Sequence, residues 1–291
     1  MDSIHRTVLL NETINGLNLK PDSVVLDCTF GGGGHSAEIL RRFTKAKIIA
    51  LDQDKKAWRQ NDVRISFHNE NFSNLDKVLK NEKVDSIIFD LGLSSDQLEN
   101  SGRGFSFLKN EPLLMTMKDN PSTEDITAND VVNTWSEKSL ADIIYGYGEE
   151  KYSRRIAKGI VEAREKAEIK TTSDLVKIIS EAVPGIYKRG RLHFATRTFQ
   201  ALRIAVNDEL GVLQTGLEKG FETLKTGGRM SVISFHSLED RVTKKFYKTL
   251  EKEGKAILIN KKPILAKEEE LKNNPRSRSA KLRILEKITK I

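Results

Sequence analysis

Cysteine is nearly absent from this sequence of 291 residues, and its scarcity excludes several classes of protein. The one cysteine, Cys28, cannot form an internal disulfide, and no Cys-x-x-Cys pair is present to bind zinc. The five histidines are scattered along the chain without the spacing of metal ligands. We therefore expect neither a disulfide framework nor a bound metal.

Long hydrophobic runs are also missing. No stretch of 18 apolar residues occurs, and the first six residues lack the apolar core of a signal peptide, so we expect a cytoplasmic protein without a membrane span. The composition, 38% hydrophobic and 31% charged, is that of a globular chain with one large domain or two unequal ones. A net charge of +8 favours a polyanionic partner without identifying it.

The most informative stretch is residues 24–36, which read as a short buried strand, a loop of four glycines and the start of a helix. This order is typical of sites that bind nucleotide-like ligands at the carboxyl end of a parallel sheet. The dinucleotide pattern G-x-G-x-x-G is incomplete, because Ser36 stands at the third glycine. No Gly-Lys-Ser/Thr follows either, so a Walker phosphate loop is excluded.

Acidic residues follow three of the predicted strands. Asp27 precedes the glycines, where it disfavours a pyrophosphate and suits a cation such as the sulfonium of S-adenosylmethionine. Asp52 ends the strand predicted at 47–51, about 20 positions beyond the loop, where a ribose is usually bound. Asp90 ends the strand predicted at 84–90, beside the ligand crevice. The alternative interpretations are a structural glycine turn and a solvated turn aspartate.

Aromatic residues allow two interpretations as well. Phe72 either lies against an adenine or belongs to the core. The loop 100–107 carries Arg103, Phe105 and Phe107, which suit a phosphate and an unpaired base. Alternatively, the two phenylalanines close the core behind a turn.

The character of the chain changes near Pro112, and residues 121–206 have a helical pattern. We therefore expect a discontinuous α/β domain, residues 1–111 and 207–291, interrupted by a helical domain at 112–206. Within the helical part, Thr171 to Asp174 predicts a capping box. A basic stripe either follows a phosphate backbone or is a solvated helix face, and its members are Lys151, Arg154, Arg155 and Lys158.

The last third of the chain returns to the α/β pattern. Ser237 with Asp240 predicts a capping box for the helix that runs to Lys252. His236 precedes it at the carboxyl end of a strand, a plausible position for a site residue. Residues 282–285 are expected to form a final edge strand.

Eight segments, taken in order, resemble the MraW/RsmH family of bacterial methyltransferases, which use S-adenosylmethionine to methylate the exocyclic amine of a cytosine in small-subunit ribosomal RNA. The segments are residues 5–10, 29–36, 90–95, 103–107, 147–150, 196–207, 234–241 and 274–279. The resemblance covers nearly the whole chain. It implies a Rossmann-like class I methyltransferase sheet with an inserted all-helical domain for substrate recognition.

The resemblance also implies roles for individual residues. Those expected to bind the cofactor are Gly33, Gly34, His35, Asp52, Phe72, Asp90 and Gln97. Those expected on the RNA side are Arg103, Phe105, Phe107, His193, Arg197 and His236. The sequence departs from the family pattern at Leu114 and Thr116, where an acid and an arginine are usual, and at Phe194, usually proline.

The implied activity is transfer of a methyl group from S-adenosylmethionine to the N4 amine of a cytosine in 16S ribosomal RNA, near the decoding centre. Asp90 is the candidate catalytic residue, as the acceptor for the amine N–H. The alternatives are an amino-methyltransferase for another nucleic acid and a ribosome-assembly factor with little turnover. The expected partner is the small ribosomal subunit, and the sequence does not indicate an oligomeric state.

Overall fold

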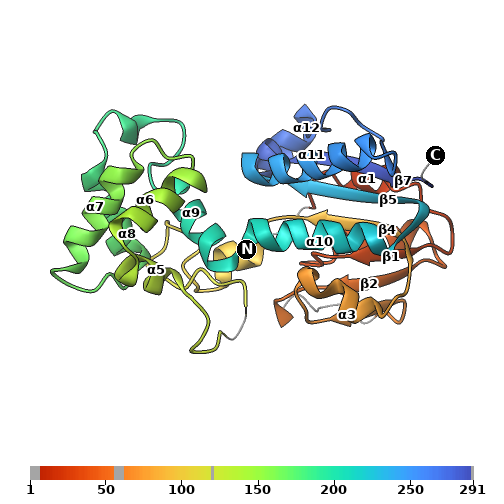
Figure 1. The fold of residues 1–291 in the computed structure, drawn as a ribbon, viewed down its shortest axis with the longest axis horizontal. Helices are drawn as coiled ribbons and strands as arrows, with labels where there is room; N and C mark the ends of the chain where they lie inside the picture. Colours follow the sequence, from red (N-terminus) through yellow and green to blue (C-terminus); the bar gives the residue numbers. More distant parts are fainter. Residues whose placement is uncertain (1–6, 56–61, 119–120, 290–291) are drawn as a thin grey trace. The chain divides into compact units, whose positions relative to one another are not determined.

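The computed structural model describes residues 7–55, 62–118 and 121–289 (Figure 1). The family-like segment at residues 5–10 therefore lies partly outside the described residues. The chain divides into two compact units, which are described separately: unit 1 is Met1–Ser94 with Leu210–Ile291, and unit 2 is Ser95–Glu209. No helix among these residues is long and apolar enough to cross a bilayer.

Unit 1 is built on a seven-stranded sheet in the order β3-β2-β1-β4-β5-β7-β6. The strands are β1 Val24–Asp27, β2 Lys47–Leu51, β3 Ile65–His68, β4 Val84–Asp90, β5 Leu224–Ser234, β6 Ala256–Leu258 and β7 Lys281–Lys287. The first five run parallel, and β7 is antiparallel to both of its neighbours. The predicted Rossmann-like methyltransferase sheet is thereby confirmed.

One prediction about this sheet is wrong. Residues 282–285 belong to β7, which lies between β5 and β6 rather than at an edge. The edge position is taken by β6, a strand of three residues that is too short to give a recognisable alternating pattern.

The sheet is buried on both faces, which explains why the apolar residues Ile87, Ile88 and Phe89 of β4 are consecutive rather than alternating with polar ones. One face packs against α3, α10 and α11, and the opposite face against α1 and α2. Alternate residues of β4 serve the two cores, since Ile87 and Phe89 lie in the first and Ile88 in the second. The helices of this unit are α1 Leu10–Gly16, α2 Gly34–Arg42, η2 Phe72–Asn74, α3 Leu75–Leu79, α10 Glu209–Thr223, α11 Ser237–Lys252, α12 Glu268–Asn273 and η4 Pro275–Ser279.

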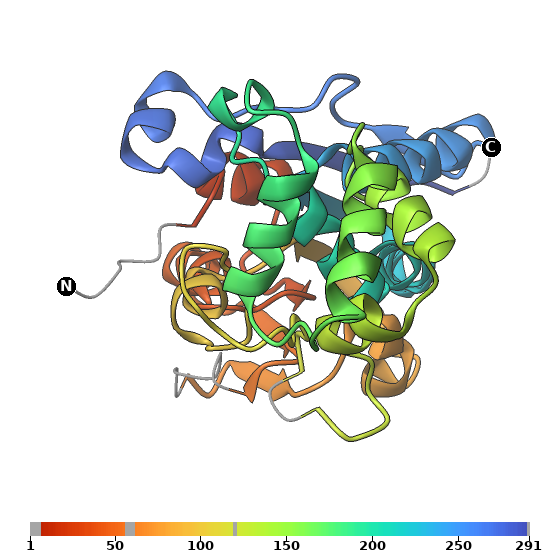
Figure 2. The same cartoon turned by 90° about the vertical axis from the view of Figure 1, so that its left-hand side faces the viewer.

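Unit 2 consists of helices joined by irregular segments, and the β-structure among the residues described for it is a single bridge between Pro112 and Thr171. Its helices are α4 Ser95–Asn100, α5 Ala128–Thr134, α6 Glu137–Gly146, α7 Ser153–Arg164, α8 Thr172–Ala182, η3 Tyr187–Arg189 and α9 Thr196–Asn207 (Figure 2). The predicted capping box of Thr171 and Asp174 is confirmed at the start of α8. Apolar side chains from neighbouring helices, such as Ile144, Ile156 and Ile179, are fully buried in this unit.

Unit 2 begins at Ser95, upstream of the change in sequence character near Pro112. The reason is local packing. Met115 donates its backbone N–H to the carbonyl of Arg103 at 2.7 Å, which ties the loop at 100–107 to the segment that follows it.

Candidate active site

The glycine loop connects β1 to α2 at the carboxyl edge of the sheet. Gly31 and Gly33 have φ angles of +51° and +72°, in the left-handed region that favours glycine. Gly33 is the residue that precedes α2, and no side chain caps the first turn of this helix. The first-turn N–H groups therefore point toward the crevice, in the arrangement that binds polar ligands at helix N-termini.

Asp52 fixes the conformation of this loop. Its Oδ2 accepts the backbone N–H of Gly31 at 2.7 Å, and its Oδ1 accepts the N–H of Asp54 at 2.8 Å. These two bonds hold the carboxylate against the glycine loop, at the end of β2. The residue predicted to bind a ribose is thus also a structural part of the loop.

Asp27 lies beneath the loop and is 2% exposed. It accepts the hydroxyl of Ser36 at 2.6 Å and the N–H of Thr29 at 3.3 Å. Burial nevertheless raises the pKa of Asp27 to about 6, with a smaller contribution from the negative charge of Asp52. Asp27 therefore keeps its proton to a higher pH than an exposed aspartate does.

Asp90, at the end of β4, is the most perturbed of these carboxyls. Its backbone N–H donates to Thr29 Oγ1 at 2.6 Å, and its Oδ2 lies 3.7 Å from His35 Nδ1. Its Oδ1 is buried and has no hydrogen-bond partner among the described residues. Burial first, and then the charges of Asp27 and Glu239, raise the pKa of Asp90 to about 8.

These features fit a cationic ligand with polar hydroxyls. A buried carboxyl oxygen without a partner is costly, and perturbed carboxyls of this kind concentrate at functional sites. A bound cation would favour the ionised form of Asp90, whereas a pyrophosphate would be repelled.

The carboxyl end of β5 is followed by His236, a predicted site residue, and by Glu239, which the sequence pattern did not reveal. His236, not Ser237, precedes α11, and its Nδ1 accepts the N–H of Glu239 while Glu239 Oε2 accepts the N–H of His236. The predicted capping box of Ser237 and Asp240 is therefore wrong by one residue. Asp240 instead accepts from Arg283 at 2.7 Å. Glu239 is 3% exposed, and only its proximity to Asp90 in the fold shows its electrostatic importance.

Phe72 is positioned by the core of unit 1. Its ring packs edge-to-face on Phe89 with centroids 5.4 Å apart. A Cβ atom at Gly216 would lie 2.5 Å from the ring, so α10 approaches Phe72 closely. These contacts support the interpretation of Phe72 as a core residue. Its ring is only half-buried, and its contact with an adenine stays a prediction.

Gln97 lies on α4 and belongs to unit 2, unlike the other predicted cofactor residues. In the same unit, Arg103 and Phe105 are each 7% exposed. Arg103 Nη1 donates to the carbonyls of Thr116, Met117 and Lys118, at 3.2, 3.0 and 2.9 Å. These contacts support the interpretation of this loop as part of a core. They also involve backbone carbonyls, so they do not depend on the unusual side chains at Leu114 and Thr116.

Phe107 and His193, 86 positions apart in the sequence, form the centre of an aromatic cluster in unit 2. Their rings stack with centroids 4.5 Å apart and an interplanar angle of 8°. Phe194 lies 4.2 Å from His193, so the departure from proline enlarges this cluster. Burial lowers the pKa of His193. Arg197 donates to the carbonyl of Glu149 at 3.1 Å.

A Rossmann-like sheet whose glycine loop is surrounded by carboxyls, without a phosphate-binding lysine, defines an S-adenosylmethionine-dependent methyltransferase. The sequence matches the MraW methylase family over residues 2–288, and the chain belongs to that family. The predicted cofactor, S-adenosylmethionine, is thereby confirmed.

Named relatives extend over the full length of the chain. It is 46% identical over 314 residues to the ribosomal RNA small subunit methyltransferase H of Clostridium botulinum, covering 99% of this chain and 100% of the relative. The enzyme of the same name from Acetivibrio thermocellus is 46% identical over 316 residues, with the same coverage. Among solved structures, an rRNA methylase from Streptococcus thermophilus has a TM-score of 0.44 at 12% identity, covering 96% of this chain and 94% of the other.

Proposed function

We propose that this protein transfers a methyl group from S-adenosylmethionine to the N4 amine of a cytosine in 16S ribosomal RNA of the small subunit, near the decoding centre. The relatives named ribosomal RNA small subunit methyltransferase H support the class of substrate. The observation that carries the chemistry is Asp90, a partly buried carboxyl whose Oδ1 is buried and has no hydrogen-bond partner among the described residues.

The cofactor site is formed by the glycine loop and its acids. Gly33, Gly34 and His35 present the first turn of α2, and Asp52 binds the ribose. Phe72 borders the adenine, and Gln97 completes the site. S-adenosylmethionine, when bound, supplies an electrophilic methyl carbon on a sulfonium centre.

Asp90 acts on the attacking amine. The lone pair of a cytosine amine is delocalised into the ring, so the nitrogen gains positive charge as it takes the methyl group, whose bond to sulfur breaks. A hydrogen-bond acceptor aimed at its N–H stabilises that transition state more than the ground state. The methylated amine then loses a proton to water. With a pKa of about 8, Asp90 is mainly protonated at pH 7 in the protein alone, and a neighbouring cation favours the carboxylate that accepts the bond.

Unit 2 provides the contacts to RNA. It contains the helical region predicted at 112–206, together with Arg103, Phe105 and Phe107. Arg103 and Phe105 support the loop from within. Phe107 and His193 offer an aromatic surface on which an unstacked base can lie, and Arg197 supplies a positive charge nearby in the sequence. In unit 1, His236 caps α11 and orders the end of β5 close to the acids.

The test uses labelled S-adenosylmethionine with three substrates: small ribosomal subunits from cells without this activity, naked ribosomal RNA, and DNA. Nucleoside mass analysis then identifies the product. Cytosine methylated on its amine, in subunits or their RNA, is the expected result. Label in DNA alone would assign another nucleic acid, and cofactor binding with no label in any substrate would favour an assembly factor.

A further inference from the structure

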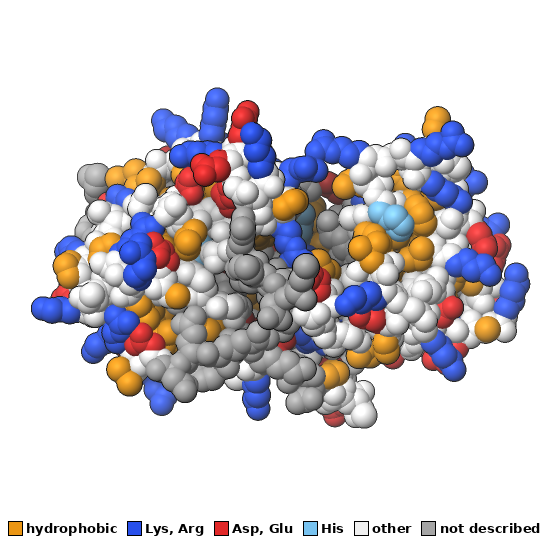
Figure 3. All heavy atoms as spheres, turned by 180° about the vertical axis from the view of Figure 1, so that it is seen from behind, with side chains coloured by type: hydrophobic (Ala, Val, Ile, Leu, Met, Phe, Trp, Pro, Cys, Tyr) orange, Lys and Arg blue, Asp and Glu red, His pale blue; other side chains and the backbone are white. Residues whose placement is uncertain are grey.

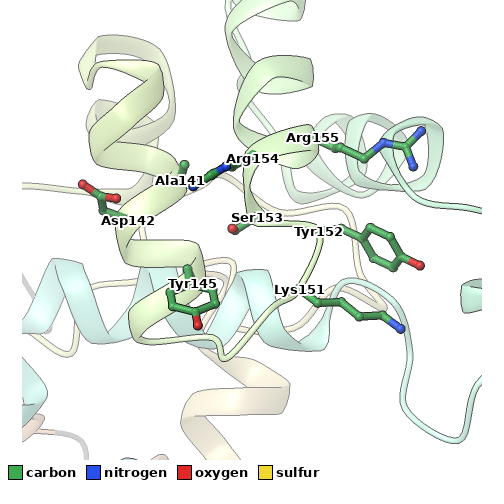
Figure 4. Close-up of a pocket in the computed structure, with 8 residues that line it drawn as sticks. All are labelled: Ala141, Asp142, Tyr145, Lys151, Tyr152, Ser153, Arg154 and Arg155. Carbon is green, nitrogen blue, oxygen red and sulfur yellow. The ribbon is translucent and has the colours of Figure 1, made fainter.

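Unit 2 contains a cavity that the proposed chemistry does not use. It has a volume of about 380 Å³ and lies where α6 ends and α7 begins (Figure 4). Its walls include Tyr145, Lys151, Tyr152, Ser153, Arg154 and Arg155. On the face shown in Figure 3, Lys and Arg side chains are scattered among other types, so positive charge alone does not mark a binding surface. The cavity is a more specific feature.

The cavity wall carries the cations Lys151, Arg154 and Arg155. Among the described residues, no carboxylate lies within ion-pair distance of Arg154 or Arg155. Both arginines stand in the first turn of α7, which has no acidic residue and no side-chain cap. The N-terminus of a helix carries a partial positive charge, so two cations there repel it as well as each other. An anion in the cavity would relieve this repulsion.

Ser153 gives an independent indication of a ligand. It is 5% exposed and lines the cavity, yet its hydroxyl has no hydrogen-bond partner among the described residues. In Figure 4 the hydroxyl is directed toward α6. The oxygen is open to the cavity rather than cut off from solvent, so a ligand can reach it. A ligand oxygen in the cavity would satisfy it.

Two tyrosines, Tyr145 and Tyr152, also line the cavity. Tyr145 is 67% exposed and offers an open ring. Tyr152 is held edge-to-face against Tyr187 at 5.0 Å, and Lys151 Nζ lies over both rings at 5.1 and 5.3 Å. The single acid of the cavity wall, Asp142, lies on the opposite side of the group from Arg155 in Figure 4. Cations interleaved with aromatic rings are typical of single-strand nucleic acid binding.

We propose that this cavity binds one nucleotide of single-stranded RNA, at a position other than the methylated cytosine. Arg154 and Ser153, which are both directed toward α6 in Figure 4, bind its phosphate, and Tyr145 stacks on its base. The volume lies in the range of ordinary small-ligand sites. The inference deepens the proposed function and rests on RNA being the substrate.

The test compares two double variants of the full-length protein. Arg154→Ala with Arg155→Ala removes the charge of the cavity. Lys158→Ala with Lys166→Ala removes the same charge from exposed positions that do not line it. Binding of a short labelled single-stranded RNA is measured by fluorescence anisotropy at several salt concentrations.

The cavity variant should bind about tenfold more weakly, and the slope of log Kd against log salt should fall by about 0.7, the value for one phosphate contact on a single strand. The lysine control should stay within about twofold of wild type. Cofactor binding should be unchanged in both. The cavity variant should melt at the same temperature as wild type or higher, since it loses a repulsion.

A third variant tests stacking. Tyr145→Ala should weaken single-stranded RNA binding roughly fivefold or more and leave binding of a duplex unaffected. Equal losses in the two double variants would show general charge attraction and overturn the cavity site, as would a cavity variant that binds like wild type. If the wild-type protein methylates no RNA, the proposed function itself fails. That result is distinct from the two binding results that would overturn the cavity site.

Discussion

The two units place charge in opposite environments. In unit 1 the buried acids Asp27 and Glu239 and the partly buried Asp90 lie around the end of the sheet, where removal from water makes charge costly. In unit 2 the cations Arg154 and Arg155 stand exposed beside a cavity, where water screens them. The first arrangement suits one small cation held in a fixed pose. The second suits a long polyanion that is contacted at many points.

The largest effect is expected at Asp90. Asp90→Asn should lower methyl transfer roughly 100-fold or more, because an amide is a weaker acceptor for a nitrogen that is gaining positive charge. Single-turnover transfer measures this effect. The matched control is Asp22→Asn, an exposed aspartate before β1, which should leave the rate unchanged. A normal rate in Asp90→Asn would remove Asp90 from the chemistry.

The same variant tests whether burial of the carboxyl costs stability. Folding raises the pKa of Asp90 from 3.8 to about 8, so the folded protein binds the proton more tightly than the unfolded chain. The stability associated with that proton is fully present below pH 4 and is lost as the pH rises toward 8. Without cofactor, Asp90→Asn should therefore unfold at a higher denaturant concentration than wild type at pH 8.5. A difference that does not shrink at lower pH would contradict this account.

Substitution of Asp52 should have a smaller effect, which is confined to the affinity for the cofactor. Asp52→Ala removes the acceptor for two backbone amides and the proposed ribose ligand, so affinity for S-adenosylmethionine should fall about 10- to 100-fold. Asp52→Asn, which keeps one acceptor oxygen, should fall less. Calorimetry measures both. Undiminished binding in Asp52→Ala would rule out the ribose assignment, and RNA binding by either variant should match wild type.

A disruption inside unit 2 should weaken RNA binding and leave cofactor binding unchanged, the reverse of the result expected for Asp52. Glu150 is fully buried, accepting the hydroxyl of Tyr187 and, at 2.9 Å, the backbone N–H of Tyr152. Tyr187→Phe removes one partner of a buried carboxylate and should lower the free energy of unfolding by about 1–3 kcal/mol. RNA affinity should fall because Tyr152 loses support, whereas cofactor affinity should not change. Equal losses of both affinities would contradict the separate roles of the units.

The smallest effect concerns the start of α11. His236→Ala should cost about 1 kcal/mol of stability, the usual value of an N-cap, and His236→Asn should recover most of it. Ser237→Ala should cost less stability than His236→Ala. Thermal melts of the three variants decide which residue is the cap, and a larger loss in Ser237→Ala would restore the sequence-based assignment.

Much of unit 1 was predictable because its signals are local. Asp27, Asp52 and Asp90 each end a buried apolar run, and parallel strands bring such ends to one edge. Glu239 was not predictable, because its effect on Asp90 depends on how the strands pair. The stacking of Phe107 on His193 was missed for the same reason, since no local pattern connects residues so far apart in sequence. The sequence also could not show whether Arg103 is buried or exposed, and the structure shows that it is buried.

The place of β7 has a consequence for how the molecule is made. This strand, at Lys281–Lys287, is inserted between β5 and β6, and Lys287 Nζ donates to three carbonyls around the end of α10. Unit 2 is continuous in sequence and has all of its residues when Glu209 leaves the ribosome. The sheet must wait for the remaining 78 residues up to Lys287, roughly 4–16 s at ordinary rates of synthesis. During translation unit 2 is therefore complete before the sheet of unit 1, whose strands come from both before and after unit 2 in the sequence. The edge of β5 stays unpaired until β7 has been synthesised.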